Sequence, residues 1–488
     1  MKERSLYLDV AKAVVIIISV ILMCRFTLGG MAVMLALIGI IAAVMHKPAI
    51  TACCFIVFPM MTLLNRAIVG LSGITLLVGR FSFTLMVVAL SLSGMIGVRM
   101  REKLPIKWIF LYIGVACLSS MDGWMPLISY LKIVNFSLMI LGIYLLSKMI
   151  QTDIRSLYAV RVFFMAMSVI MIVLSLVVYF IPSIGFSMTL YRLASYGNLV
   201  TGEELMESGS KILFNGMTCH SQMLSPVVSC LGAWVVCDML LIERRVVLFH
   251  CAILSCVPVL LYLSRSRGGL VMLASVVILI FFVTIPKARL AQHVKNRLGM
   301  IVMLAAVLLV GAGVYFECKN EALSRWVRKT DDVSSDGRTL KEAFTGSRQR
   351  LIENNLRDFY LNPLLGKGFQ VVEGMDRAYA TGEAAWFSAS VEKGVTPFVI
   401  LGETGIFGAA AFLFFLSSFY GTCFRRGYMS LMTNFTCFLV ANLADSTLFS
   451  PSGMGGFMWI VACIGGFATD CYAKVKLEVS RSLRGTGF

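Results

Sequence analysis

Long apolar runs separated by short polar connections make up most of this chain. A run of about 17 to 25 apolar residues is long enough to cross a bilayer as a helix. On this basis the sequence predicts an all-α integral membrane protein, a polytopic bundle of about 12–14 transmembrane helices. The predicted spans are 9–24, 29–45, 49–68, 81–98, 108–120, 126–147, 158–181, 214–241, 246–263, 268–285, 299–316, 395–418, 429–447 and 453–470.

Two polar segments interrupt this pattern. We expect residues 1–316 to hold the first set of about 11 spans, with an outward loop at 182–212. Residues 317–393 then form one large outer loop that contains an amphipathic helix, 394–470 the C-terminal spans, and 471–488 a basic tail. The large loop carries 12 basic and 12 acidic residues. A neutral loop is not a polyanion-binding surface, so no nucleic-acid partner is expected.

The distribution of charge predicts the orientation in the membrane. The formal net charge is +17. Among the short connections, most basic residues fall in alternate ones, which the positive-inside rule assigns to the cytoplasm. Both termini are then cytoplasmic, and the loops 182–212 and 317–393 face outward. The basic residues on the inner side are Lys2, Arg4, Lys47, Arg99, Arg101, Lys103, Lys107, Lys148, Arg155, Arg244, Arg245, Lys287, Arg289, Lys295, Arg297, Arg425, Arg426, Lys474, Lys476, Arg481 and Arg484.

Composition agrees with a membrane protein and offers no cofactor motif. Hydrophobic residues make up 58% and charged residues only 14% of the chain, and the mean hydropathy is +0.85. Most of the 14 cysteines lie inside apolar runs, without the spacing of a metal site. Rossmann and P-loop signatures are missing. The sequence therefore predicts neither a cofactor nor a metal.

Two arginines stand at a turn that is predicted to face outward. Arg265 and Arg267 lie in Leu263-Ser-Arg-Ser-Arg-Gly-Gly269, between two apolar runs. Their position runs against the positive-inside preference, so an offsetting charge is expected. An anionic ligand at the membrane surface would supply it. The alternative is that both side chains reach toward lipid headgroups.

The large loop contains one amphipathic helix. Ser347 is a candidate N-cap for a helix from Arg348 to Leu361, and Asn362-Pro363 would end it. Arg348 would then lie in the first turn, where free backbone N–H groups favour an anion such as phosphate. An ordinary solvated helix is the alternative. The apolar face predicted for this helix consists of Leu351, Ile352, Leu356, Phe359 and Tyr360.

Charged residues within the predicted spans are expensive to bury and are expected to be paired between helices. They are Lys132, Arg161, Asp238 and Asp445.

Several of these segments together resemble the O-antigen ligase and O-antigen/exopolysaccharide polymerase superfamily of bacterial inner membranes. Ser266-Arg267-Gly268 is similar to the first essential arginine of the family. Gly346-Ser-Arg348 followed by Pro363-Leu-Leu-Gly-Lys-Gly368 resembles the second, with matching spacing. Glu403-Thr-Gly405-Ile-Phe-Gly408 and, more loosely, Phe214-Asn-Gly-Met-Thr-Cys-His-Ser-Gln222 resemble two further segments. The resemblance covers roughly residues 210 to 415.

One departure from the family pattern concerns a histidine. The ligase branch usually carries a His-Asn or His-Ser pair shortly before the Glu of its last motif. Here that place holds Glu392-Lys393-Gly394, and His220 is the histidine predicted on the outer side. The departure favours a polymerase over a lipid A-core ligase.

The resemblance implies a metal-independent lipid-linked glycosyltransferase of the bacterial inner membrane. The donor would be a glycan on undecaprenyl pyrophosphate, and the acceptor a glycan or lipid A-core hydroxyl. Arg267 and Arg348 would stabilise the leaving pyrophosphate, with His220 or Glu392 as general base. Membrane lipids, a chain-length regulator and a flippase are further candidate partners. Candidate substrate-binding residues are Arg265, Arg350, Arg357, Lys393 and Glu403; for Glu403 and His220, purely structural hydrogen bonding is the alternative.

Two other function classes compete with this prediction. A transporter or flippase of lipid-linked oligosaccharide would show two similar halves with interrupted helices in corresponding positions. The sequence shows neither. A membrane assembly protein without chemistry would leave the outward arginines without a role.

Overall fold

The computed structural model describes residues 3–27, 30–64, 73–100, 102–180, 192–193, 199–200, 214–218, 221–264, 267–280, 340–372, 394–443, 446–451 and 453–485. Helices make up nearly all of these residues, which confirms the predicted all-α polytopic fold class. The α-helices are α1 (Glu3–Phe26), α2 (Gly30–Val44), α3 (Pro48–Leu63), α5 (Gly73–Leu92), α6 (Ile109–Ser119), α7 (Pro126–Ile150), α8 (Ile154–Ser168), α9 (Ser175–Phe180), α11 (Ser221–Asp238), α12 (Leu248–Leu263), α13 (Arg267–Leu279), α17 (Leu340–Leu361), α19 (Thr396–Arg426), α20 (Met429–Ala441), α21 (Gly453–Trp459) and α22 (Phe467–Gly485).

Short segments of other geometry join these helices. The 3-10 helix η1 (Ser120–Asp122) follows α6. The π-helical segments η2 (Val169–Leu174), η3 (Met239–Glu243) and η6 (Ile460–Gly466) continue α8, α11 and α21. Strands β1 (Arg192–Leu193) and β2 (Leu199–Val200) pair antiparallel inside the loop predicted at 182–212.

The described helices confirm the multi-pass organisation. Six of them are long and apolar enough to cross a membrane: Leu6–Cys24, Pro126–Ile150, Ile154–Tyr179, Met223–Glu243, Thr396–Arg426 and Gly453–Val479. Shorter apolar helices occupy most of the other predicted spans. The span predicted at 299–316 lies outside the described residues. The span predicted at 81–98 lies earlier in the chain, as α5 (Gly73–Leu92), and Gly94 follows it with a positive φ of 75°.

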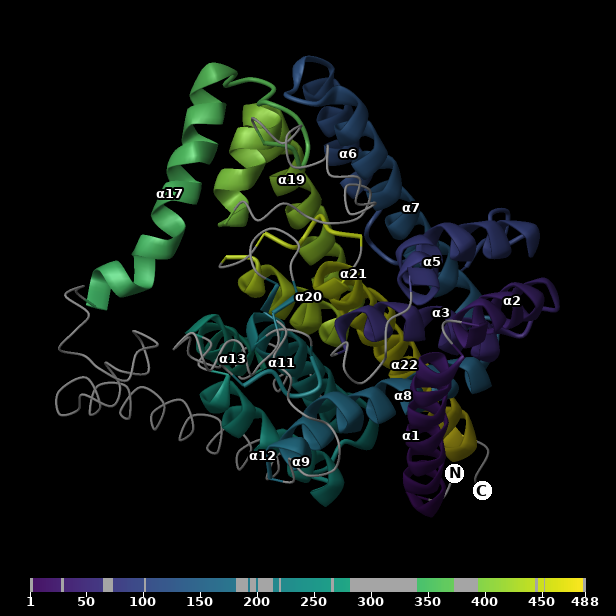
Figure 1. Cartoon of the computed structure of the whole chain (residues 1–488). Coiled ribbons are helices and arrows are strands. Elements are labelled where there is room, and N and C mark those ends of the chain that lie inside the picture. Colours follow the sequence, from purple (N-terminus) through teal and green to yellow (C-terminus); the bar gives the residue numbers. More distant parts are fainter. Residues whose placement is uncertain are drawn as a thin grey trace.

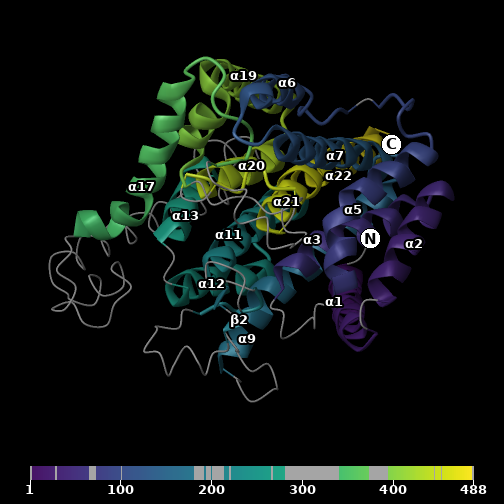
Figure 2. The ribbon, with the colours of Figure 1, turned by 45° about the horizontal axis from the view of Figure 1, so that its top comes forward.

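The helices form one packed bundle in which α11 is central. It contacts α8, α12, α13, α20 and η6. On one flank, α2, α3 and α5 pack together, and α5 also packs against α7. On the other flank, α19 packs between α6 and α17 (Figure 1). In the turned view, α6 and α19 again lie side by side, with α17 at the outer margin (Figure 2). The position of α17 therefore depends on α19.

A buried ion network links α8 to α11 and α12. The Arg161 guanidinium lies 2.7 Å from one Asp238 carboxylate oxygen and also contacts Glu243. The other Asp238 oxygen lies 3.0 Å from Nε2 of His250, which is fully buried. The expected buried pairing of Arg161 and Asp238 is confirmed. Removing one partner from such a pair typically costs about 3–5 kcal/mol, so this network stabilises the helix bundle.

The other two charged positions behave differently. Lys132 is buried, but its ammonium donates to the backbone oxygen of Gln370 at 2.9 Å, in the large loop. The large loop therefore supplies one hydrogen-bond partner of Lys132. Asp445 lies outside the described residues.

Candidate functional site

The helix that follows the large loop is broken in its third turn. Gly405, in the middle of the last motif, has φ 61° and ψ −161°, which is not helical. In a continuous helix Ile406 and Phe407 would donate to Gly402 and Glu403. The break therefore leaves two N–H groups and two carbonyls inside a membrane protein without their helical partners. Such groups must find other partners or cost several kcal/mol each.

A turn of the large loop supplies these partners. We call residues 363–368 the docking turn. Ile406 N–H donates to Pro363 at 2.9 Å, and Phe407 N–H donates to Leu364 at 3.3 Å. In the other direction, Lys367 N–H donates to Gly402 at 2.9 Å and Gly368 N–H donates to Glu403 at 3.1 Å. The docking turn thus satisfies all four backbone groups that the break exposes.

Two glycines make this close approach feasible. Gly366 has φ 71°, and a Cβ built on it would lie 2.4 Å from the carbonyl carbon of Glu403. Gly405 has φ 61°, and its Cβ would lie 2.4 Å from the carbonyl carbon of Leu364. A side chain at either position would meet backbone, which cannot swing away. Gly366 and Gly405, which belong to two different motifs, are therefore both needed for the contact between the docking turn and α19.

The hairpin between α6 and α7 holds the same turn from the opposite side. Gly368 N–H donates to the Ser119 hydroxyl at 3.2 Å, and that hydroxyl donates to the Glu403 carbonyl. Trp124 N–H donates to the Lys367 carbonyl at 3.0 Å, and the Lys367 ammonium lies 5.4 Å from the Trp124 ring centroid. The docking turn is therefore clamped between two parts of the bundle.

The residues after the docking turn enter the core. Phe369 is 1% exposed and packs among the rings of Tyr112, Phe136 and Phe449. The Ser129 hydroxyl donates to the Phe369 carbonyl at 3.0 Å. Burial of a phenylalanine side chain contributes about 1.5–3 kcal/mol, so Phe369 anchors this end of the large loop.

The helix α17, which carries Arg348, packs on α19. Asn355 is 4% exposed, and its backbone lies within 2.8 Å of a Cβ built on Gly402. Leu351 packs in the same way against Gly394. Arg348 lies about two turns before Asn355 and is partly buried. Its helix is thus fixed by contacts at the start of α19.

The structure corrects two details of the predicted loop helix. The helix ends at Leu361 as predicted, but it begins at Leu340, so Ser347 lies inside α17 and is not an N-cap. The residues before Ser347 continue the helix, and Arg348 does not lie at free N–H groups. Tyr360, predicted on the packed face, is 72% exposed because Asn355 and Asp358 occupy that face instead.

The remaining sequence-predicted residues are distributed as follows. Arg267 is the first residue of α13, as expected for a turn that opens a helix. The helix α13 packs on α20, and α20 contacts α19. Arg350 and Arg357 lie on the exposed side of α17. Glu403 is 1% exposed at the docking turn. Arg265, His220, Glu392 and Lys393 lie outside the described residues; α11 begins directly after His220, and α19 begins three residues after Lys393.

Sequence reasoning missed three serines of the α6–α7 hairpin, and for Lys132 it predicted pairing between helices and not a contact with the large loop. Ser119, Ser120, Ser129 and Lys132 all bond to backbone atoms of residues 368–370. These four lie about 240 positions earlier in the chain, and their spacing is that of ordinary helix residues. The only local signal is the Ser119-Ser120 pair where an apolar run ends. Among the described residues, no group of three or more His, Cys, Asp or Glu side chains has the geometry to hold a metal.

Comparison with known families gives one match. Residues 250–413 match the family model described as O-antigen ligase. The matched segment contains Arg267, α17, the docking turn and the break in α19. A search of the curated proteins found no match.

Proposed function

We propose that this chain polymerises a lipid-linked glycan, because residues 250–413 match the family model described as O-antigen ligase. The match, together with the long apolar helices, supports a membrane enzyme of the glycan-transfer type. The donor is a glycan on undecaprenyl pyrophosphate, and the acceptor is a sugar hydroxyl of a second glycan. Transfer to lipid A-core, as in a ligase, is the second candidate.

The observation that carries this proposal is the packing of the matched segment. The helix that holds Arg348 is fixed on α19 by Gly402 and Gly394, and the docking turn ties its C-terminal end to the break at Gly405. A catalytic side chain must be held within a fraction of an ångström of its working position. A helix that is held on α19 in this way is a suitable support for a residue with that task.

The reaction we propose is a direct displacement. The acceptor hydroxyl oxygen forms a bond to the anomeric carbon of the donor sugar, and the bond from that carbon to the pyrophosphate oxygen breaks. The electron pair stays on the leaving pyrophosphate, where Arg267 and Arg348 stabilise the new charge. A well-placed donor of this kind contributes about 3–4 kcal/mol. The hydroxyl proton passes to a general base, for which His220 and Glu392 are our candidates.

The other predicted site residues take supporting roles in this proposal. Arg265, Arg350, Arg357 and Lys393 provide positive charge for the glycan-linked phosphates on the outer surface. Glu403 contributes first through its backbone carbonyl, which receives both Gly368 N–H and the Ser119 hydroxyl. Its carboxylate remains our candidate for a substrate contact.

A transporter remains the rival from another class, and one observation disfavours it. Broken helices of transporters offer unpaired backbone groups to the transported ion or substrate. Here the docking turn occupies the groups exposed at Gly405. The break therefore serves to fasten a loop of the same chain.

We further propose that the protein lies in the bacterial inner membrane with both termini in the cytoplasm. Loop 317–393, with Arg348 and the docking turn, then faces the periplasm. Support comes from the distribution of basic residues along the sequence. It also comes from the arrangement of α19. The docking turn bonds near the beginning of this helix, whereas Arg425 and Arg426 lie in its last turn.

The test is glycan chain length in cells that carry Arg267→Ala or Arg348→Ala. We expect loss of long chains at normal protein level, because 3–4 kcal/mol corresponds to about a hundredfold to a thousandfold in rate. Arg348→Lys keeps the charge without the guanidinium fork, and we expect it to recover only part of the activity.

Gln349→Ala is the matched control. Gln349 is the next residue on α17 and is exposed, and its side-chain amide donates to Glu353 at 3.0 Å. Unchanged chain length in either arginine variant would refute the proposed roles. A deletion strain then separates the two reactions: glycans of a single repeat unit indicate a polymerase, whereas full-length chains left on undecaprenyl pyrophosphate indicate a ligase.

A further inference from the structure

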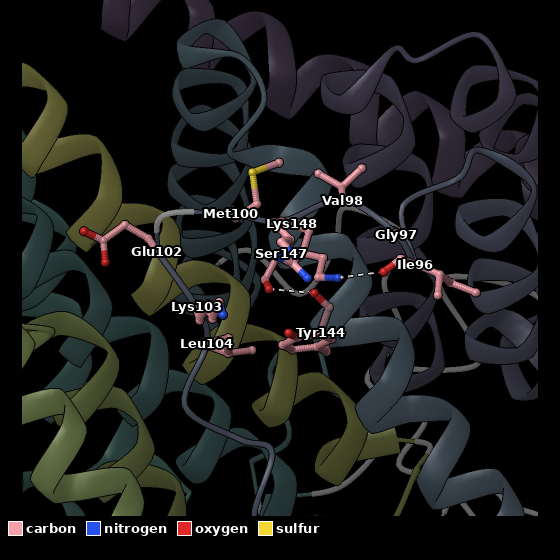
Figure 3. Close-up of a pocket in the computed structure, with 11 residues that line it drawn as sticks. Ile96, Gly97, Val98, Met100, Glu102, Lys103, Leu104, Tyr144, Ser147 and Lys148 are labelled. Atoms are coloured by element: carbon pink, nitrogen blue, oxygen red, sulfur yellow. Dashed lines mark hydrogen bonds between the residues drawn. The ribbon is translucent and has the colours of Figure 1, made fainter.

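Two adjoining cavities lie at the end of the bundle away from the docking turn, and we call them the basic cavities. The larger has a volume of about 590 Å³ and lies between the segment before α6 and the end of α19. The smaller, of about 190 Å³, lies between the same segment and the end of α7 (Figure 3). Lys103, Leu104 and Tyr144 line both. The two volumes therefore belong to one continuous region.

Cations dominate the lining of this region. Lys103, Lys107, Arg425 and Arg426 line the larger cavity, and Arg99, Lys103 and Lys148 line the smaller one. Ser418 and Thr422 add hydroxyl groups to the larger cavity. Positive charges brought together from three separate segments repel each other unless an anion lies between them. The lining is therefore suited to an anion, such as a phosphate group.

The cations have weak partners within the described part of the chain. The Lys107 ammonium lies 4.9 Å from the Trp108 ring centroid. Nε of Arg425 donates to the Gly421 carbonyl at 3.2 Å, and the Lys148 ammonium donates to the Ile96 carbonyl at 3.2 Å. These contacts orient the side chains without neutralising their charge.

Glu102 is the one carboxylate among the residues that line the two cavities, and it is engaged elsewhere. It accepts hydrogen bonds from Tyr428 and from the Lys474 ammonium at 3.0 Å, and it lies 3.7 Å from Arg426. Figure 3 shows its carboxylate directed away from Lys103 and Lys148. Glu102 therefore neutralises Arg426 of α19 and Lys474 of α22. The lysines that line the cavities can then bind another anion.

An exposed apolar face continues from the larger cavity. Trp108 lines the cavity, is 38% exposed, and meets the Phe414 ring edge-on at a centroid distance of 5.0 Å. Further along α6 and α19, Phe110, Leu111 and Leu413 are also exposed. Aromatic side chains at such a boundary are typical of the interface between headgroups and acyl chains. A ligand with a charged head and apolar tails matches both parts.

We infer that the basic cavities bind the headgroup of an anionic phospholipid of the inner leaflet, whose acyl chains lie against Trp108 and Phe414. Basic pockets between transmembrane helices on the cytoplasmic side are suited to such headgroups. The apolar face is the reason to choose a lipid over free phosphate, since free phosphate has nothing to place there. This inference does not depend on glycan transfer.

The experiment uses the purified full chain in detergent, with thermal unfolding followed by tryptophan fluorescence. The probe is dioleoylphosphatidylglycerol added as mixed micelles, compared with dioleoylphosphatidylcholine and with sodium phosphate. We expect a saturable rise of Tm with phosphatidylglycerol alone. Each cation removed should raise the half-saturating lipid concentration about fivefold, so Lys103→Gln/Lys107→Gln/Arg425→Gln should raise it by about a hundredfold.

The matched control is Lys47→Gln/Arg155→Gln, which removes two exposed cations from other connections predicted to face the cytoplasm. It should respond to phosphatidylglycerol as the wild type does. The same loss per cation in this control, about 25-fold for its two cations, would overturn the inference in favour of unspecific surface attraction. If sodium phosphate alone raises Tm and abolishes the lipid effect, the ligand is free phosphate and not a lipid. If the triple variant does not fold, Lys107→Gln alone should still show the fivefold shift, and no shift would overturn the inference.

Discussion

The docking turn and the basic cavities lie at different ends of α19, and different kinds of contact build them. The docking turn is held by main-chain hydrogen bonds between residues far apart in sequence, made possible by Gly366 and Gly405. The basic cavities are lined by long cationic side chains that reach in from three connections. The first end depends on backbone shape, whereas the other depends on charge.

This difference predicts how each end responds to change. Main-chain hydrogen bonds inside a membrane protein have no water to replace them, so a small change of shape has a large effect. Exposed cations are hydrated and screened by salt, so single substitutions have small effects. We expect the docking turn to govern folding and activity, and the basic cavities to adjust stability to the surrounding ions and lipids.

The largest effect is expected for Gly366→Ala. The new Cβ would lie 2.4 Å from the Glu403 carbonyl carbon at a φ of 71°, so the turn must move and its hydrogen bonds to the break are lost. We expect a loss of about 3 kcal/mol or more in unfolding free energy, together with loss of long glycan chains. Thermal unfolding and glycan profiles measure both.

Gly421→Ala is the control for that substitution. Gly421 lies on α19, the helix to which the docking turn is bonded, and a Cβ built on it has no atom within 4 Å. Alanine there should be neutral or stabilise by up to about 1 kcal/mol, since it is the better helix former. An equally mild effect of Gly366→Ala would refute the assigned role of the docking turn.

A smaller loss of unfolding free energy is expected for Lys132→Met, at the end of the bundle near the docking turn. Lys148→Met is the corresponding substitution at the basic cavities. Both lysines are on α7 and both donate to a loop carbonyl, Lys132 to Gln370 and Lys148 to Ile96. Lys132 is 1% exposed, and Gln370 has a positive φ of 53° that this contact holds in place. Loss of a buried hydrogen bond to a charged group costs about 1.5–3 kcal/mol.

For Lys148→Met we expect less than about 1 kcal/mol, because that lysine lies at the hydrated end. The measurement is the unfolding free energy of each variant at low and high salt. Equal losses in the two variants, or a strong salt dependence for Lys132→Met, would remove the distinction between the two ends.

The smallest effect is expected for Glu102→Gln, and it should depend on pH. Burial opposes ionisation of Glu102, but hydrogen bonds from Tyr428 and Lys474 and the charges of Lys474 and Arg426 outweigh it and lower its pKa below the usual 4.5. A lowered folded-state pKa stabilises the protein above the unfolded-state pKa, and this contribution is lost as the pH falls through the folded-state value.

We therefore expect Glu102→Gln to reduce the unfolding free energy by up to about 1 kcal/mol at pH 7. The difference from wild type should shrink on acidification below about pH 4.5. Unfolding curves at pH 7 and under acidic conditions test this. A difference of the same size at both pH values would mean that shape, and not charge, is what glutamine alters.

Much of the fold could be predicted because membrane insertion is encoded locally. Apolar runs of sufficient length located the described spans, and the arginine that opens α13 was placed correctly. The end of α17 at Leu361 was predicted because Pro363 cannot continue a helix. The predicted start was wrong. Ser347 could cap the helix only if the helix began there, but residues 340–346 are also helical.

The sequence by itself determined which segments enter the membrane, where the basic residues fall and which short motifs occur, since each depends on neighbouring residues. Only the tertiary structure decided what fills the break in α19, because the groups exposed at Gly405 are satisfied by a turn about 40 residues earlier and by Ser119 far earlier still. Backbone hydrogen bonds across such separations use groups that nearly every residue carries, so they leave no pattern of side chains to find. The basic cavities likewise arise only when three connections meet.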